Sequence, residues 1–323
     1  MNMSRRSLGL ALTGMALARA VQAQGEWPRG PVRLVVGFPP GGGNDLLARI
    51  LAEELGRAFG QPFVVDNRPG GSGVIAIEAV KRAASDGQTL LIGPSSGMTV
   101  NPLVLPSVSY DPLRDFAPVG IIGNFPLLVV VNSANPARSL AALIATAKAR
   151  PGEVTYAGAA TSFQIATEIF AADASIRLLH VPYRGSAPAM QAVLANEVSL
   201  TFGDVAAVLP LVQSGQLRAL AISTRTRSAD LPEVPTVMEA GVPGYDLVLW
   251  SALFAPQGTP AAVTSRLQAE LARLAVDQGF RERLRRLGVE AVGSTPEVLT
   301  ATMRRELDSF GRIVRSAGIS MQN

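Results

Sequence analysis

The chain has 323 residues, of which 48% are hydrophobic and 17% are charged. This length corresponds to about two domains, and so apolar a chain can bury a large core, which excludes a largely disordered protein. The sequence contains no cysteine, which excludes disulfides, thiol catalysis, thiolate metal sites and a lipid-anchored cysteine.

Residues 1–23 have the pattern of a secretory signal peptide rather than of a buried helix. Arg5 and Arg6 are followed by a short apolar run over 8–18 and by Val21-Gln22-Ala23, a small-x-small cleavage pattern. The two arginines fit both the Sec and the twin-arginine export routes. Cleavage would remove three arginines and no acid, so the net charge falls from +4 to 26 − 25 = +1. With no basic stripe in the remaining chain, we expect no nucleic-acid partner.

The rest of the chain alternates apolar strand patterns with amphipathic helical patterns, which indicates α/β layers with largely parallel sheets. In the first part we expect strands over 32–38, 63–66 and 89–93, separated by helices over 44–59 and 72–84. A strand over 127–131 then leads to 132–136, where we expect a crossing to a second lobe. The pattern restarts there with helices over 140–149, 161–173, 187–195 and 209–214 between strands over 154–156, 178–181, 198–202 and 217–223.

The apolar run over 250–255 can return the chain to the first lobe, and helices are expected over 260–275, 278–287 and 296–317. The predicted division is therefore 24–130 with 253–323 in lobe 1, and 131–252 in lobe 2. Two Rossmann-like lobes joined by two hinge crossings leave a cleft between them, and small-molecule sites concentrate in such clefts.

A glycine-rich loop, Gly37-Phe-Pro-Pro-Gly-Gly-Gly-Asn44-Asp45, lies between the first strand and the first helix. Consecutive glycines let a ligand approach the backbone, and the free N–H groups of a helix start favour an anion. No Lys follows for a phosphate loop, and Leu46 replaces the third glycine of a dinucleotide motif, so a carboxylate is the expected anion. Asp45 also fits a plain helix cap. The expected contacts from this loop are Phe38, Gly41, Gly42, Gly43, Asn44 and Asp45.

A second candidate, Gly93-Pro-Ser95-Ser96-Gly97, has the spacing of a hydrolase nucleophile elbow. An elbow needs a helix directly after the serine, and residues 98–102 are poor helix formers. A triad also needs a late histidine, but the only histidine, His180, lies in mid-chain. We therefore predict that Ser95 and Ser96 hydrogen-bond a ligand rather than attack one.

In the second lobe, the segment from His180 to Ala187 contains the end of a strand and the start of a helix. That helix start should face the cleft, where Arg184 either pairs with a carboxylate or lies on the solvated surface. A lone histidine is not a metal site, and we interpret His180 as a structural hydrogen-bonding residue. The expected second-lobe contacts are Thr161, Ser162, Gln164, Tyr183, Gly185, Ser186 and Ala187.

Asp204 follows Gly203 at the end of the predicted strand over 198–202. An acid at the carboxyl end of a strand is placed to meet a ligand, and its carboxylate could accept from an amine or hydroxyl, or orient a water. A turn aspartate explains the pattern equally well.

Taken together, several stretches resemble the periplasmic substrate-binding receptors of tripartite tricarboxylate transporters, the Bug family. The matching stretches are Pro31-Val-Arg-Leu-Val-Val-Gly-Phe-Pro-Pro-Gly-Gly, Val65-Asp-Asn-Arg-Pro-Gly-Gly-Ser-Gly, Asp86-Gly-Gln-Thr-Leu, Asp111-Pro-Leu-Arg-Asp-Phe-Ala-Pro-Val, His180-Val-Pro-Tyr-Arg-Gly, Leu217-Arg-Ala-Leu-Ala, Leu231-Pro-Glu-Val-Pro-Thr-Val-Met-Glu-Ala-Gly and Ala255-Pro-Gln-Gly-Thr-Pro. The resemblance departs from the family pattern at Gln164, where His is common, and at Arg184, where Lys is frequent.

The resemblance implies a two-lobed, type II-like periplasmic binding fold that captures a small carboxylate and delivers it to a membrane permease. It implies that loop amides and ordered waters hold the carboxylate, with no catalysis, no cofactor and no metal, in a monomer exported to the periplasm. A ligand sensor that reports solute occupancy to a signalling partner is the alternative function, and an enzyme on this fold is a third.

Overall fold

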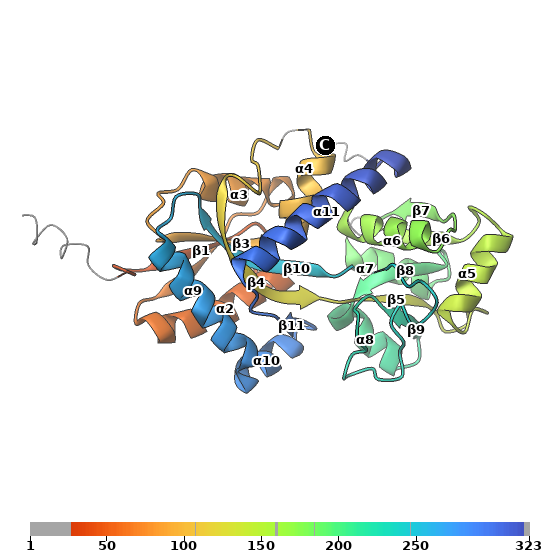
Figure 1. The fold of residues 1–323 in the computed structure, drawn as a ribbon. Helices are drawn as coiled ribbons and strands as arrows, with labels where there is room; N and C mark the ends of the chain where they lie inside the picture. The colour runs from red at the N-terminus through yellow and green to blue at the C-terminus, as the bar shows by residue number, and fades with distance from the viewer. Residues whose placement is uncertain (1–26, 107, 159–160, 184, 246, 320–323) are drawn as a thin grey trace, which may run out of the picture.

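The structure, a computed structural model, describes residues 27–319 apart from 107, 159–160, 184 and 246. Two β-sheets with helices on their faces form two lobes that lie side by side along the long axis of the molecule (Figure 1). The predicted signal peptide and the cleavage site lie outside the described residues. No helix among the described residues is long and apolar enough to cross a membrane.

The sheet of the first lobe has six strands in the order β11-β4-β10-β3-β1-β2. Its strands are β1 (Val32–Val36), β2 (Phe63–Asn67), β3 (Thr89–Pro94), β4 (Phe116–Phe125), β10 (Leu249–Pro256) and β11 (Glu290–Ala291). Strands β1, β2 and β3 are parallel, whereas β10 runs antiparallel to β3 and β4 because it returns from the second lobe. The sheet is therefore mixed, and only its outer part has the parallel arrangement that the alternating pattern predicted.

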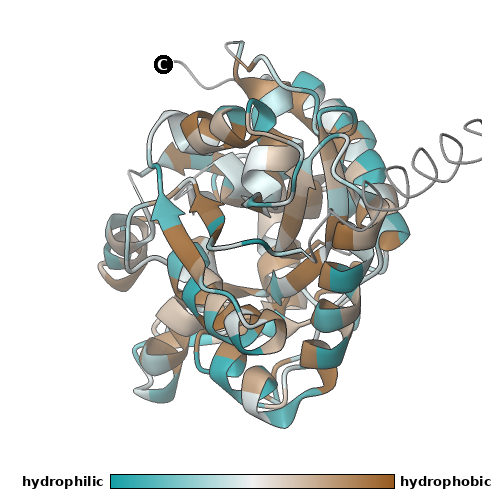
Figure 2. Ribbon diagram, turned by 90° about the vertical axis from the view of Figure 1, so that its left-hand side faces the viewer, coloured by the Kyte–Doolittle hydropathy of each residue, from teal (hydrophilic) through white to brown (hydrophobic). Residues whose placement is uncertain are grey.

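The two faces of this sheet carry separate apolar cores, because side chains alternate along each strand. In β1, Leu34 and Val36 pack under α2 (Gly43–Phe59), α9 (Ala261–Val276) and α10 (Gln278–Arg285). Val35 points to the opposite face, where α3 (Val74–Lys81) and α11 (Pro296–Ala317) pack. Figure 2 shows this arrangement: the strands are largely hydrophobic, while the surrounding helices alternate hydrophobic and hydrophilic residues.

The sheet of the second lobe has five strands in the order β7-β6-β8-β5-β9. The strands are β5 (Leu127–Asn132), β6 (Thr155–Gly158), β7 (Leu179–Pro182), β8 (Leu200–Asp204) and β9 (Leu217–Ile222). The helices of this lobe are α5 (Leu140–Ala149), α6 (Thr161–Asp173), α7 (Ser186–Leu194) and α8 (Val205–Gln213). Strand β6 is parallel to β7 and β8, and β5 is antiparallel to β8 and β9.

The chain changes sheets earlier than the sequence pattern predicted. Strand β4 ends at Phe125 in the first sheet and β5 begins at Leu127 in the second, so the crossing lies at Pro126 rather than over 132–136. The predicted boundary at residue 130 falls inside β5. On the return, all of β10 pairs within the first sheet, so the second crossing lies in the segment before Leu249 rather than at residues 252–253.

Strand β4 was not predicted, because glycines and a proline interrupt its apolar pattern. Gly120 is required there, since a Cβ atom would lie 2.3 Å from the carbonyl oxygen of Ser294. Pro118 has no N–H to donate, and the ladder between β4 and β10 shifts register between Leu253 and Phe254, beside this residue. Tertiary contacts therefore stabilise a strand that local propensity argues against.

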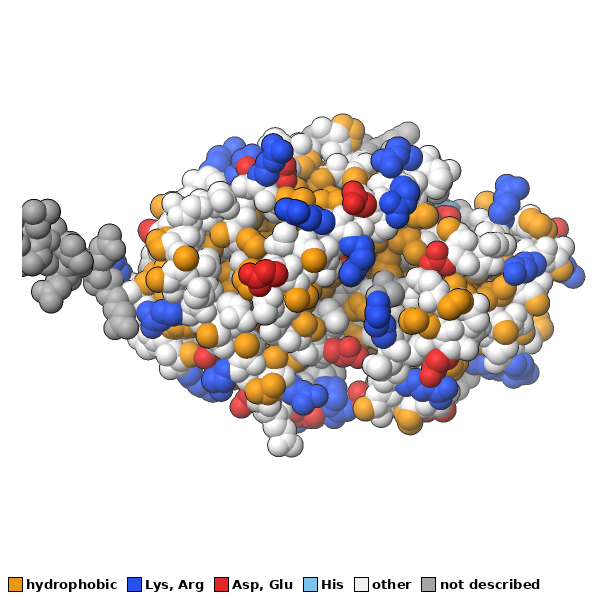
Figure 3. Space-filling view, viewed as in Figure 1, with side chains coloured by type: hydrophobic (Ala, Val, Ile, Leu, Met, Phe, Trp, Pro, Cys, Tyr) orange, Lys and Arg blue, Asp and Glu red, His pale blue; other side chains and the backbone are white. Residues whose placement is uncertain are grey.

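Helix α11 joins the two lobes. Near its start, Leu299 and Met303 pack into the core of the first lobe, whereas Phe310 and Val314 belong to the core cluster of the second. The helix runs diagonally across the molecule towards α6 (Figure 1), and positively charged side chains gather over it on the exposed face (Figure 3). The C-terminal half of α11 therefore packs on lobe 2, although the predicted division assigned residues 253–323 to lobe 1.

Candidate functional site

A cavity of about 850 Å³ lies between the lobes. Four helical segments begin at its lining: α2 at Gly43, the π-helical turn Ser96–Val100, α6 at Thr161, and α8 directly after Asp204. The first N–H groups of a helix have no partner within the helix, and the helix dipole is positive at that end. The cavity therefore offers several amide donors from both lobes to one negatively charged ligand.

The glycine-rich loop is divided between lining and support. Phe38, Gly43 and Asn44 line the cavity, whereas Gly41 and Gly42 do not. The Asn44 side-chain oxygen accepts a hydrogen bond from the Ser251 hydroxyl of β10, which orients the amide at the start of α2. The loop thus reaches the cavity at both ends, through Phe38 after β1 and through Gly43 and Asn44 at the start of α2.

Asp45 lies outside the cavity lining and holds the glycine-rich loop in place. Its carboxylate accepts hydrogen bonds from the Gly41 N–H at 2.8 Å, the Arg49 guanidinium at 3.0 Å and the Asn67 amide at 2.9 Å. Burial opposes ionisation of Asp45, but these donors outweigh it, and the pKa of Asp45 is lowered. Asp45 therefore acts by holding the loop in place and does not face the ligand cavity.

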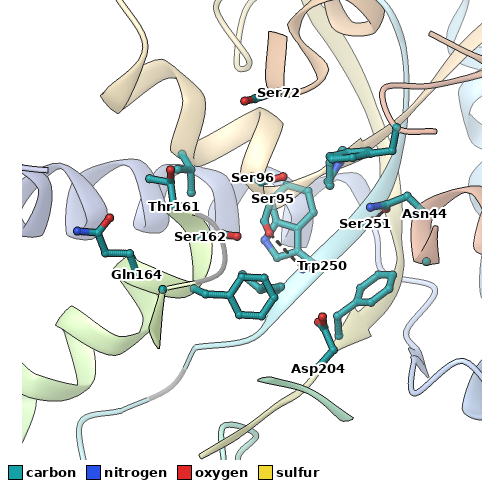
Figure 4. Close-up of a pocket in the computed structure, with 18 of the residues that line it drawn as sticks. Asn44, Ser72, Ser95, Ser96, Thr161, Ser162, Gln164, Asp204, Trp250 and Ser251 are labelled. Carbon is teal, nitrogen blue, oxygen red and sulfur yellow. Dashed lines mark hydrogen bonds between the residues drawn. The ribbon is translucent and has the colours of Figure 1, made fainter. Parts of the chain in front are cut away.

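Ser95 and Ser96 line the cavity where β3 ends. The Ser95 hydroxyl accepts from the Trp250 backbone N–H at 3.3 Å, and Trp250 itself also lines the cavity. Figure 4 shows Ser95, Ser96, Asn44, Trp250 and Ser251 grouped on one side of the cavity. Contrary to expectation, helical turns follow Ser95 directly, because the turn Ser96–Val100 continues into α4 (Asn101–Val104).

A buried acid of α11 supports this group from behind. Glu306 is 8% exposed and accepts hydrogen bonds from the Trp250 indole N–H at 2.9 Å and the Thr99 hydroxyl at 2.8 Å. Burial raises the pKa of Glu306 to about 7, although both donors favour the ionised form. The orientation of the Trp250 ring thus depends on a residue that lies outside the cavity lining.

The second lobe contributes polar side chains from α6 and from the end of β7. Thr161, Ser162, Gln164 and Tyr183 line the cavity, whereas Gly185, Ser186 and Ala187, at the start of α7, do not. The expectation that the α7 start contacts the ligand is thus not met in this arrangement, and α6 and α8 present their first turns instead. Arg184 lies outside the described residues.

His180 also lines the cavity, although we expected only a structural role. Its ring stacks on Tyr156 with centroids 5.0 Å apart, and burial lowers the pKa of His180. No hydrogen bond joins His180 to a serine among the described residues, and the Ser95 hydroxyl already accepts from Trp250. The described residues thus form no Ser–His nucleophile pair, and they contain no cluster of three metal-ligating side chains.

Asp204 ends β8 and faces the cavity from below in the view of Figure 4. It occupies the N-cap position of α8, yet its carboxylate makes no capping hydrogen bond. Burial raises the pKa of Asp204 to about 6. The carboxylate therefore serves neither as a cap nor as a partner in an ion pair among the described residues.

Several lining residues were missed because most of them lie outside the polar motifs, and those inside a motif carry no polar side chain. They are mostly apolar, and they are Ser72, Pro94, Val100, Asn101, Phe125, Gly158, Phe163, Pro182, Ala206, Ala207, Leu249, Trp250, Ser251 and Leu287. The pairing of β4 with β10 brings Phe125 and Leu249 opposite each other at the lobe boundary. Because β4 was not predicted, the sequence had no signal for this pair.

Comparisons with known proteins agree with this architecture. A family model described as the tripartite tricarboxylate transporter family receptor matches residues 47–319. Protein BugT of Bordetella pertussis is 36% identical, over 100% of both chains. The solved structure of R. palustris Rpa4515 with adipate is 36% identical with a TM-score of 0.78, covering 91% of this chain and 99% of that one. MatC of Rhodopseudomonas palustris with bound malate is 28% identical with a TM-score of 0.73, covering 89% and 100%.

Proposed function

This chain belongs to the tripartite tricarboxylate transporter receptor family, a family of solute-binding receptors, and on that premise we propose that it captures a small carboxylate between its two lobes. The observation that carries the proposal is the convergence of four helical starts on one cavity, at Gly43, Ser96, Thr161 and Val205. Backbone amides at helix starts bind anions without needing a cationic side chain. No Lys or Arg lines the cavity among the described residues, so these amides are the main charge-complementing groups there for a carboxylate.

Two relatives support a carboxylate ligand. The adipate complex of Rpa4515 and the malate complex of MatC each hold a small carboxylic acid in a chain of similar fold. The cavity here also has hydroxyl and amide side chains at Ser95, Ser96 and Gln164, which hydrogen-bond an anion without carrying charge. A ligand that contacts both lobes favours the closed form by its differential affinity for that form.

We further propose that the mature chain acts in the periplasm, beginning near Gln24, and delivers its ligand to a membrane permease. The support is the signal-peptide pattern of residues 1–23 together with membership of a transport receptor family. The mass of the exported protein from the native host measures the cleavage site, and full-length chain in the cytosol would contradict the proposal. Uptake of labelled ligand should be lost when the receptor gene is deleted.

Thermal-shift screening against mono- and dicarboxylates, neutral sugars and amines tests the capture function, followed by calorimetric titration of each hit. A ligand of the folded state raises the melting temperature by mass action. Ala207→Trp fills the cavity from an exposed position on α8, so it should abolish binding while leaving the fold intact. Ala145→Trp, on the exposed face of α5, makes the same change away from the cavity and should bind normally. Binding of sugars or amines alone, or binding that survives in Ala207→Trp, would contradict the proposal.

A further inference from the structure

Asp204 places an unpaired acid inside the ligand cavity. It ends β8 opposite Leu127 of β5, and its carboxylate accepts only from its own backbone N–H among the described residues. Asp204 is half-buried at the cavity wall, and a carboxylate that loses part of its hydration usually acquires a cation or several donors. The fold does not need this carboxylate for helix capping, because the Asp204 side chain makes no capping hydrogen bond at the start of α8.

The groups around Asp204 provide no counter-charge. The other titratable side chains of the described lining are His180 and Tyr183, and burial lowers the pKa of His180, which favours its neutral form. Strand β5 and helix α8 carry no charged residue. On the segment around Leu287, Arg286 pairs with Glu282, and burial raises the pKa of Glu290. Among the described residues, no cation therefore pairs with the Asp204 carboxylate, which is free to meet a charged group of the ligand.

We propose that the cavity binds a carboxylate that also carries an ammonium group, and that this ammonium group pairs with the Asp204 carboxylate. The inference rests on the proposed function and adds the class of ligand. Figure 4 places Asp204 below the cavity, with Ser95, Ser96 and Asn44 on the opposite side. A zwitterionic ligand can therefore direct its carboxylate to the serines and helix starts, and its ammonium group to Asp204.

The pH dependence distinguishes this arrangement from a protonated Asp204 that donates to the ligand. Because burial raises the pKa of free Asp204 to about 6, an ammonium ligand must compete with the proton. Its affinity should then rise as the pH increases through about 6 and level off above that value. A ligand that needs the protonated acid would bind more weakly as the pH rises, which would overturn the proposal.

Matched sets of ligands provide the main test: succinate, malate and aspartate, and phenylpropionate, phenyllactate and phenylalanine. Calorimetry on the wild-type protein should show the ammonium member of a set binding roughly tenfold or more tightly than its unsubstituted member. Asp204→Asn keeps the shape and removes the charge, so the preference should disappear. The unsubstituted carboxylate should bind that variant as well as or better than the wild type.

Asp308→Asn removes an exposed carboxylate of α11 away from the cavity and should keep the wild-type preference. An equal gain from a hydroxyl and an ammonium group, or a preference that survives in Asp204→Asn, would overturn the ammonium assignment. Either of those outcomes would be compatible with the proposed function, the capture of a carboxylate. Failure of every carboxylate to bind would instead contradict the proposed function itself.

Discussion

The two sides of the cavity differ in how their polar groups are satisfied. The first-lobe side (Asn44, Ser95, Trp250 and Ser251) is joined by internal hydrogen bonds, with Ser251 donating to Asn44 and Trp250 donating to Ser95. The second-lobe side (Thr161, Ser162, Gln164, Tyr183 and Asp204) lines the same cavity, yet these side chains have no hydrogen bond to another described residue. One side is therefore fixed before a ligand arrives, while the other still has unused donors and acceptors.

This difference indicates a division of labour between the lobes. A network that is already satisfied holds its geometry and stabilises the fold, because breaking it leaves buried groups unpaired. Unused polar groups facing a cavity contribute little to folding and gain partners only when a ligand bridges the lobes. Substitutions on the first-lobe side should therefore lower stability, and substitutions on the second-lobe side should change ligand affinity without lowering stability.

The largest effect should come from Glu306, which supports the first-lobe side. Glu306→Ala removes the acceptor of the Trp250 indole N–H and leaves a void, so the free energy of unfolding should fall by about 2–4 kcal/mol. Glu306→Gln keeps an acceptor oxygen and should lose about 1 kcal/mol or less. Urea unfolding followed by tryptophan fluorescence measures both. Equal losses in the two variants would show that the hydrogen bond to Trp250 is not what matters.

On the second-lobe side, substitution of Asp204 should raise the free energy of unfolding rather than lower it. Burial raises the pKa of folded Asp204 to about 6 from its ordinary value of 3.8. The protonated form is therefore favoured by folding, and its contribution to stability is full below about pH 4 and is lost as the pH rises through about 6. Asp204→Asn should then be more stable than the wild type by about 2 kcal/mol above pH 7, and equal to it near pH 4. Denaturation at both pH values measures this, and a destabilised variant at neutral pH would mean that Asp204 has a partner in the protein.

The smallest effect is expected from a matched pair of serines. Ser251→Ala removes the donor to Asn44 and should lower the free energy of unfolding by about 1 kcal/mol. Ser162→Ala removes a hydroxyl without a hydrogen-bond partner among the described residues, so stability should change by less than about 0.5 kcal/mol. Ligand affinity should nevertheless fall in Ser162→Ala. Chemical denaturation and calorimetry of both variants would refute the division of labour if Ser162→Ala were the less stable of the two.

Much of the fold could be predicted because periodicity is strong where one face of an element is buried. The predicted helices over 140–149, 161–173 and 296–317 agree with α5, α6 and α11 at both ends. Strand β4 could not be predicted, since the contacts that stabilise it come from β10 and from residues near Ser294, far along the chain. The predicted lobe boundaries were displaced for the same reason.

The candidate site was only partly predictable, because a motif shows where a loop lies but not which of its groups face the ligand. Asn44 and Asp45 are adjacent at the start of α2, yet Asn44 lines the cavity and Asp45 holds the loop. Trp250 and Phe125 carry no polar motif and reach the cavity through the register of β4 and β10. Such residues become visible only once the two lobes are placed together.

A crystal structure of the protein with its tightest-binding carboxylate tests the central claim most directly. The account predicts one ligand in the cavity between the lobes, with its carboxylate within hydrogen-bond distance of the helix starts near Gly43 and Ser96. It also predicts contacts from the second lobe at Ser162 or Asp204. A ligand bound outside this cavity, or held by the first lobe alone, would contradict the account.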